Sequence, residues 1–425
     1  MNACRTYRLR AIAIFGALFF LNACAGRVTQ SAVPIGNFES VGALVPANPA
    51  GAYQVIYPFG GGLDGGNAAT QLVFDSQGNA YGTTVQGGNA GCGTVFRLHL
   101  VSGQWHETVL YNFGCFADGK NPHGGVVRDS LGNLYGTTVA GGLSGGCTGD
   151  GCGVIFEIKH GGGEAVLYTF QGKDDGFGPG SPLTFGPDGT LYGTAPDGGA
   201  HSSGTVFSIN PNTHHFQVIH PFSGGDGGST GSLGALLVTA KGAIYGVTEL
   251  GGAHQAGIAY RLTHPSGSPW KFEPIYTFKG QPDAANPYGG LIEVNGKFYG
   301  TTYFGGTAGA GSVFELTPAS GTFGERVVYS FKGGTDGSSP TSTLVAGPGG
   351  AVYGTTSAGG RTSCGCGTVF ALAKSTLTES VLHRFGALHD GQNPYYGLTQ
   401  FGSTLYSSTV AGGTSGSGTI FSITP

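Results

Sequence analysis

Charged residues are scarce in this sequence of 425 residues, at 10% of the chain, against about 25% in ordinary globular proteins. The net charge is only −4 and no lysine- or arginine-rich patch stands out, so a nucleic-acid partner is not expected. The 3.6-residue period of amphipathic helices is absent, which excludes helical repeats. Glycine does not recur at every third position, which excludes collagen.

Glycine and aromatic residues are abundant instead. The chain has 85 glycines, 27 phenylalanines and 19 tyrosines, and 39% of its residues are hydrophobic. This hydrophobic content argues against intrinsic disorder. Short aromatic and β-branched runs separated by glycine-containing turns indicate an all-β chain.

The N-terminal residues 1–23 have the features of an export signal. Arg5, Arg8 and Arg10 form a basic region, and the apolar stretch 11–21 has 11 residues. A stretch of this length is too short to span a bilayer, which takes roughly 20 residues. We therefore expect a cleaved signal peptide over 1–23.

The end of this segment, Leu21-Asn22-Ala23-Cys24, resembles a bacterial lipobox. The resemblance implies lipidation of Cys24 and attachment of the protein to a membrane. Ala25 follows the cysteine, which by the Gram-negative sorting pattern implies the outer membrane, on its periplasmic or surface face. Residues 24–51 are then the lipidated cysteine and a flexible tether. The alternative is an ordinary signal peptide cut nearby.

A single pattern recurs seven times in the rest of the chain. The motif YGTT and its variants begin at positions spaced by 54, 57, 53, 54, 54 and 53 residues. A glycine-rich loop follows each copy, and then a partner such as GTVF or GSVF. The copies begin at Tyr81, Tyr135, Tyr192, Tyr245, Tyr299, Tyr353 and Tyr406.

Each period contains four short strands, which in the first copy are TQLVFD, NAYGTTV, GTVFRLHL and WHETVLYNF. Their apolar and polar residues do not alternate cleanly, as expected for sheets covered on both faces. We therefore predict an all-β, seven-bladed β-propeller over 52–425 with four antiparallel strands per blade. The chain ends on a third strand. The N-terminal strand AYQVIYPF (52–59) should therefore complete the last blade and close the ring.

The motif just described, YGTT followed by two glycines and a G-T-V-F-like strand, resembles the GloVer tandem repeat of exported bacterial proteins. The resemblance covers roughly residues 52–425, and the blades are also similar to those of NHL and kelch-like propellers. It implies the propeller fold and export. It implies no particular chemistry.

The glycine-rich loops are not expected to bind phosphate. No lysine follows the glycines, and strands flank the loops where a phosphate loop would open a helix. Gly82 and its equivalents are expected to let adjacent blades approach closely.

An aspartate follows the end of each fourth strand, and these residues form a candidate ligand face. A carboxylate there can cap backbone amides of a turn, which we favour. It could also bind Ca²⁺ or a sugar near the axis. No cofactor is otherwise expected. The seven residues are Asp64, Asp118, Asp175, Asp226, Asp283, Asp336 and Asp390.

Six cysteines follow the lipobox, and export favours disulfides over redox thiols. Cys92 and Cys115 lie at strand ends that should meet. Cys147 and Cys152 share one loop. Cys364 and Cys366 are separated by one residue, and a bridge of that span is strained, so their pairing is left open. A zinc site is not predicted, because no CxxC pair is present.

His201 and His254 are the only histidines that occupy matching positions in neighbouring repeats. They are interpreted as exposed loop residues, with metal binding or acid–base catalysis as the alternative. Tyr288, Tyr395 and Tyr396 are expected to pack in turns, or alternatively to stack on sugars. No familiar catalytic motif is present.

The sequence therefore predicts a monomeric, lipid-anchored propeller that acts as a non-catalytic binding or scaffolding module. Its expected partner is a glycan, a peptide or an envelope protein. The alternative is a propeller enzyme acting on carbohydrate or lactone substrates, which is an analogy at the level of the fold.

Overall fold

The computed structural model describes residues 53–142, 146–147, 149–224, 234–265, 268–320, 322–347, 350–373 and 378–425. The predicted signal peptide, Cys24 and the predicted tether lie outside the described residues, as does Asp226. Among the described residues, no helix has both the length and the apolar character needed to cross a membrane.

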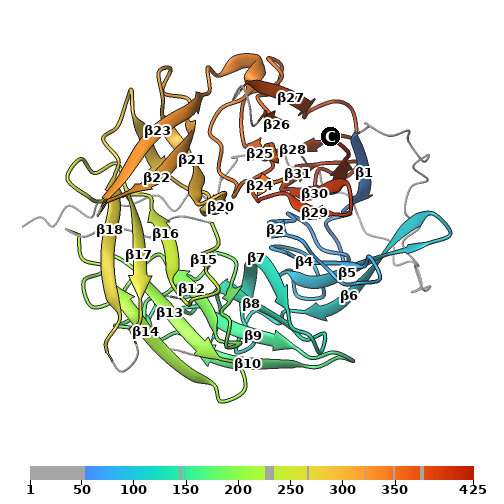
Figure 1. Ribbon diagram of the computed structural model, residues 1–425. Coiled ribbons are helices and arrows are strands. Elements are labelled where there is room, and N and C mark those ends of the chain that lie inside the picture. The colour runs from blue at the N-terminus through green and yellow to red at the C-terminus, as the bar shows by residue number, and fades with distance from the viewer. Residues whose placement is uncertain are drawn as a thin grey trace, which may run out of the picture. The chain divides into compact units, whose positions relative to one another are not determined.

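Seven antiparallel sheets, called blades 1 to 7 here, follow one another around a ring (Figure 1). Blade 1 contains β3 (Val73–Phe74), β4 (Ala80–Thr84), β5 (Thr94–Val101) and β6 (Gln104–Asn112), preceded by β2 (Thr70–Gln71). Blade 2 contains β7 (Lys120–Arg128), β8 (Leu134–Ala140), β9 (Val154–Ile158) and β10 (Glu164–Thr169). Blade 3 contains β11 (Thr184–Phe185), β12 (Leu191–Ala195), β13 (Thr205–Asn210) and β14 (His215–Pro221). Blade 4 contains β15 (Leu237–Val238), β16 (Ile244–Thr248), β17 (Ile258–Thr263) and β18 (Lys271–Thr277).

The remaining blades follow the same order. Blade 5 contains β20 (Ile292–Val294), β21 (Lys297–Gly305), β22 (Ser312–Ala319) and β23 (Thr322–Ser330), preceded by β19 (Ala284–Pro287). Blade 6 contains β24 (Val345–Ala346), β25 (Val352–Thr356), β26 (Thr368–Leu372) and β27 (Glu379–Arg384), preceded by the 3-10 turn η1 (Gly334–Asp336). Blade 7 contains β29 (Thr399–Phe401), β30 (Thr404–Thr409), β32 (Thr419–Ile423) and β1 (Tyr53–Pro58). A small pair, β28 (Gly391–Gln392) and β31 (Ala411–Gly412), lies beside blade 7.

The prediction that both chain ends build the last blade is confirmed. β1 pairs antiparallel with β32, from Tyr53 opposite Ile423 to Pro58 opposite Thr419. The short first strands lie toward the middle of the ring, and outer strands such as β6, β10 and β14 lie at its periphery (Figure 1). The blades are separate sheets packed side by side, and no single hydrogen-bonded ladder runs around the ring of described strands.

A phenylalanine at the end of each fourth strand joins its blade to the next. All seven of these rings are fully buried, and each meets an aromatic ring on the third strand of the following blade edge-on, at centroid distances from 4.9 to 5.4 Å. Edge-to-face geometry is favourable for aromatic pairs. The pairs are Phe59–Phe96, Phe113–Phe156, Phe170–Phe207, Phe222–Tyr260, Phe278–Phe314, Phe331–Phe370 and Phe385–Phe421.

The glycine of YGTT makes room within its own blade, so the prediction that it lets adjacent blades approach is wrong. A Cβ on Gly82 would lie 2.7 Å from the ring of Phe96, which belongs to the neighbouring strand of the same sheet. Close approach between blades occurs instead at the glycine before the third strand. A Cβ on Gly93 would lie 2.6 Å from Pro122 of blade 2, and Gly93 also has φ +100°, a region that favours glycine.

Three loops that lead into a new blade contain an Asn-Pro pair, and the asparagine of each bonds to the preceding blade. The side chain of Asn121 donates to the carbonyl oxygen of Val85 at 2.8 Å, and its backbone N–H donates to that of Cys92 at 2.9 Å. Asn286 and Asn393 make the same two kinds of bond. All three have φ of 56°, a left-handed conformation that asparagine tolerates better than most residues.

Candidate functional site

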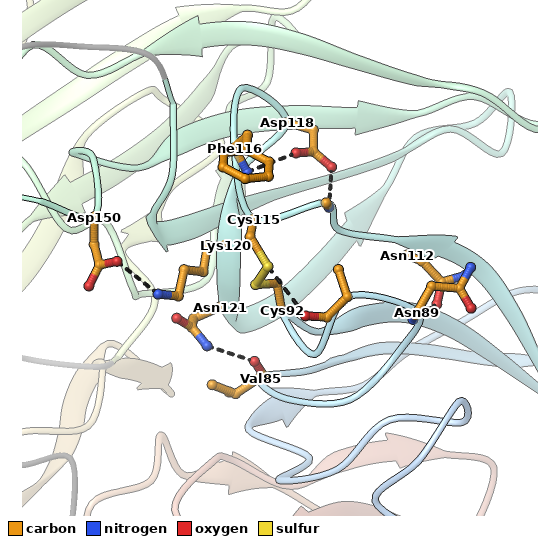
Figure 2. Close-up of a disulfide and its surroundings, with 12 residues drawn as sticks. Val85, Asn89, Cys92, Asn112, Cys115, Phe116, Asp118, Lys120, Asn121 and Asp150 are labelled. Carbon is orange, nitrogen blue, oxygen red and sulfur yellow. Dashed lines mark hydrogen bonds and ion pairs between the residues drawn. A yellow bond between two sulfur atoms is a disulfide. The ribbon is translucent and has the colours of Figure 1, made fainter.

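The aspartates predicted as a candidate ligand face hold the turns in which they lie. Asp118 accepts the backbone N–H of Gly114 at 2.6 Å and the hydroxyl of Tyr111 at 3.0 Å (Figure 2 shows the first of these bonds). Four other described aspartates accept the same two bonds, one from a backbone N–H four residues earlier and one from a tyrosine hydroxyl seven residues earlier. These are Asp64, Asp175, Asp283 and Asp336. Asp390 differs from them.

Asp390 has the same role with a histidine in place of the tyrosine. Its carboxylate meets Nε2 of His383 at 2.9 Å and accepts the N–H of Gly386 at 3.1 Å. It also accepts the hydroxyl of Tyr53 on β1. These bonds lower the pKa of Asp390 despite its burial. The described aspartates are therefore engaged by the protein itself. A role for them in binding Ca²⁺ or a sugar stays a prediction.

One position on the outer strand decides how the rim of each blade meets the preceding blade. It lies four residues before the tyrosine or histidine that stands two residues ahead of the final phenylalanine, and we call it the rim position. In three blades it is aromatic and stacks face to face on that tyrosine or histidine of the preceding blade. The stacks are Tyr53–His383, Phe216–Tyr168 and Phe272–His220, at centroid distances of 3.5, 3.7 and 4.1 Å.

In the other four blades the rim position is glutamate. Each of these carboxyl groups has one buried oxygen without a hydrogen-bond partner. Burial, followed by the charge of the nearby aspartate, raises the pKa of Glu107 to about 8 and of Glu164 to about 7. Burial, followed by a hydrogen bond with Asp283 and by the charge of that aspartate, raises the pKa of Glu325 to about 8. The pKa of Glu379 is raised by burial and then by the charge of its nearby aspartate. The nearby aspartate is Asp64 for Glu107, Asp118 for Glu164, Asp283 for Glu325 and Asp336 for Glu379.

The structure contains three disulfides among the predicted cysteines. Cys92 is joined to Cys115, as expected (Figure 2), and Cys147 to Cys152. Cys364 is joined to Cys366, a pairing that the sequence left open. Gly365 between them takes φ of 62°, and the two Cα atoms are 5.2 Å apart, within the ordinary range for a disulfide.

These disulfides fix the loops from which the next blade is held. Cys92, Cys152 and Cys366 occupy the same position, directly before the glycine of the third strand. The backbone carbonyl of each accepts an N–H from the following blade, at distances from 2.8 to 3.0 Å. The bridges therefore anchor three of the loops through which one blade holds the next.

The two matching histidines are exposed. His201 lies between β12 and β13, and His254 lies between β16 and β17. Among the described residues, no group of three or more histidine, cysteine, aspartate or glutamate side chains is placed to hold a metal ion. Metal binding or acid–base catalysis by these histidines stays untested.

A cluster at the axis is the strongest candidate for a ligand site. His123 of blade 2 and Tyr396 beside blade 7 meet at 2.8 Å between Nδ1 and Oη. Since blade 1 lies between blades 7 and 2 around the ring, we place this bond near the centre of the ring. We use "axial cluster" for this pair and four residues near it: Glu249, Tyr288, Tyr303 and Tyr395.

The axial cluster is aromatic and half-buried. The rings of Tyr288 and Tyr303 are 6.0 Å apart, and Tyr303 contacts Phe304, which is 51% exposed. Burial raises the pKa of Tyr288. The ionised forms of its neighbours raise that pKa further: Glu249, Tyr396, Tyr395 and Tyr303.

Glu249 is the one carboxyl group of the axial cluster. It directly follows β16, the second strand of blade 4, in the position that Tyr303 takes in blade 5. No described residue donates a hydrogen bond to its carboxylate, whereas its backbone carbonyl accepts from Asn286 at 3.1 Å. Burial raises the pKa of Glu249.

A family model described as the Gloeobacter/Verrucomicrobia repeat matches residues 31–236 and again 232–425. The chain belongs to this repeat family. The resemblance drawn from the YGTT motif is thereby confirmed. No curated protein matches this Gloeobacter/Verrucomicrobia repeat protein by sequence.

Solved structures resemble the repeat protein in fold. A fungal alcohol oxidase of the AA5 family, solved in complex with copper, has a TM-score of 0.53 at 13% identity, over 89% of this chain and 77% of that one. A protein described as a gluconolactonase has a TM-score of 0.43 at 12% identity, over 90% and 93%. TolB from Acinetobacter baumannii has 0.36 at 12%, over 84% and 78%. At these identities the likeness concerns the fold alone.

Three features of the site were not identified from the sequence. The tyrosines that bond the aspartates, the glutamates at the rim position and Glu249 each occupy a fixed place in the repeat. Aligning the seven copies gives a tyrosine or histidine two residues before the final phenylalanine of every fourth strand. That regularity was the available signal for the first two features. The other copies have no glutamate at the place of Glu249, so its role could be inferred only from its location at the axis.

Proposed function

We propose that this protein is a lipid-anchored binding module of the cell envelope that captures a glycan at the axial cluster. The lipid is attached to Cys24, and the protein faces the periplasm or the surface from the outer membrane. The observation that carries the proposal is the set of buried and half-buried tyrosines at the axis, beside a carboxylate to which no described residue donates a hydrogen bond. Aromatic rings stack on the apolar faces of sugars, and a few convergent polar groups fix a ligand's orientation.

An enzyme of carbohydrate or lactone chemistry is the alternative. Such an enzyme needs a second acid or a base near Glu249. The pKa of His123 in the same cluster is lowered to about 4 by its burial, and its Nδ1 is bound to Tyr396. A weak base already engaged in a hydrogen bond is a poor proton acceptor. We therefore favour binding without catalysis.

The binding step is tested by titrating the purified protein with soluble oligosaccharides of one length and different sugar type, using calorimetry. Tyr303→Ala should weaken binding about tenfold or more, because a stacking ring contributes roughly 1–2 kcal/mol. Phe401→Ala is the matched control, since Phe401 is a partly exposed ring at the end of β29 that stacks on Phe74 and not on a residue of the axial cluster. Equal losses in both variants would contradict an axial site.

The anchor is tested separately by membrane fractionation. Cys24→Ala should release the protein from the membrane fraction, because no acyl chain can then be attached. Cys4→Ala, a change of the same residue type within the predicted signal peptide, should leave the protein with the membranes. If Cys24→Ala stays membrane-bound, the lipid anchor is refuted while the axial site is unaffected.

A further inference from the structure

The axial cluster carries one formal charge, and that charge is negative. The residue that follows the YGTT-like strand differs among the blades, and Glu249 is the one carboxylic acid at this place. The others are Val85, Val139, Pro196, Tyr303, Ser357 and Val410.

No positive charge balances this carboxylate among the described residues. Burial is the only cause of the raised pKa of Glu249, and no lysine or arginine opposes it. His123 cannot serve, because burial lowers its pKa to about 4 and it is therefore neutral near pH 7. The pKa of Tyr395 is likewise raised by burial and by the neighbouring Tyr303.

A ligand cation would satisfy both parts of this site. An ammonium group is attracted by the carboxylate, and the attraction is strong where water is partly excluded. It is attracted as well by the electron-rich faces of tyrosine rings. A neutral sugar gains only the stacking. An anionic sugar is repelled by Glu249.

We propose that the axial cluster selects glycans that carry a free amino group, of the glucosamine type, over their neutral and acidic counterparts. This inference rests on the proposed glycan binding and specifies its ligand. Glu249 binds the ammonium group, and Tyr288, Tyr303 and Tyr395 form the aromatic walls around the sugar ring.

Calorimetric titration at pH 6 with a glucosamine tetramer and with its N-acetylated counterpart tests the selection. The two ligands share length and linkage and differ in the ammonium charge. The wild-type protein should bind the amino form about tenfold more tightly. Glu249→Gln should bring the two affinities to within about twofold by removing the charge at nearly constant shape. Glu293→Gln is the matched control, because Glu293 is an exposed carboxylate on β20, by the turn that precedes β21; it should retain the preference.

The outcomes separate the two proposals. Equal affinity of the wild-type protein for both tetramers would overturn the ammonium selectivity and leave glycan binding in place. A preference that survives Glu249→Gln would also overturn it, since the selectivity would then come from another group. Binding of neither tetramer, nor of any neutral or acidic oligosaccharide of the same length, would overturn both proposals.

Discussion

Blade junctions of two kinds occur around this ring, and they differ at a single residue. At three junctions the rim position is aromatic and stacks on a tyrosine or histidine of the preceding blade. At four junctions it is a glutamate close to the turn aspartate of that blade. The inner part of each junction is the same, because every one has the buried edge-to-face aromatic pair.

The difference shows which part of the repeat holds the ring together. A buried carboxyl group beside a carboxylate is unfavourable unless it keeps a proton. The fold nevertheless tolerates four such groups. Adhesion between blades must therefore come mainly from the inner aromatic pairs, and the rim position is left free to vary. The glutamate junctions should also respond to pH, whereas the junction that stacks Phe216 on Tyr168 should respond much less.

The largest effect is expected from removing an inner ring. Phe113→Ala, at a glutamate junction, and Phe170→Ala, at a stacked junction, should each lower the free energy of unfolding by about 3–5 kcal/mol, because a large cavity replaces a fully buried ring. Denaturant unfolding measures both. Similar losses would support a common inner contact. A loss below about 1 kcal/mol at either junction would mean that its rim contact compensates.

The next largest effect comes from converting one kind of junction into the other. Phe216→Glu places a carboxyl group against Tyr168 and Asp175 and removes a stacked ring, so stability should fall by about 2–3 kcal/mol at pH 7. Glu164→Phe is the reverse change, against Tyr111 and Asp118, and should leave stability equal or higher. If Phe216→Glu leaves the free energy of unfolding unchanged, the stacked ring contributes nothing to the stability of the junction.

The pH response of a glutamate junction follows from Glu107. Its folded-state pKa of about 8 lies above the ordinary value of 4.5. At pH below 4.5 the group is protonated in both states, so its junction has full stability. As pH rises from 4.5 to 8 the unfolded chain ionises while the folded protein retains the proton, and stability falls. Glu107→Gln should therefore stabilise the protein at pH 8 by about 1 kcal/mol, a modest value because the group is partly solvated, and by much less at pH 4.5.

The control for this measurement is Gln104→Glu, which adds an exposed carboxylate on the same strand β6. It should change stability little at either pH. A Glu107→Gln variant with the same pH dependence as the wild-type protein would show that Glu107 is ionised in the folded state.

The fold could be predicted because the same strand pattern recurs seven times in the sequence. YGTT and its partner strand fix the middle of each blade, and a chain that ends on a third strand requires the N-terminal strand to complete it. The role of Gly82 was assigned to the wrong contact, because spacing alone cannot show that Phe96 of the same sheet covers it. The pairing of Cys364 with Cys366 depends on the left-handed conformation of Gly365, which a spacing rule does not contain.

The candidate site was harder to predict for a physical reason. Repetition identifies what the blades share, and the aspartates were found because they recur. A ligand at the axis contacts all blades at once, so its specificity resides in the differences between them. Glu249, Tyr288 and His123 come from three blades and meet only when the ring has closed. Their proximity was therefore not available from the order of residues.

The smallest effect is expected at the glutamate junction that has two cations beside it. The hydroxyl of Tyr329 lies 3.4 Å from Glu379, and the positive charges of Arg384 and Lys332 oppose the rise in its pKa. The charged form of Glu379 is thus better tolerated than that of Glu107, which has no such neighbours. Glu379→Gln should stabilise the protein at pH 8 by only about 0.5 kcal/mol, measured by the same denaturant unfolding. A gain equal to that of Glu107→Gln would mean that burial alone, and not the local balance of charge, sets the energy of a glutamate junction.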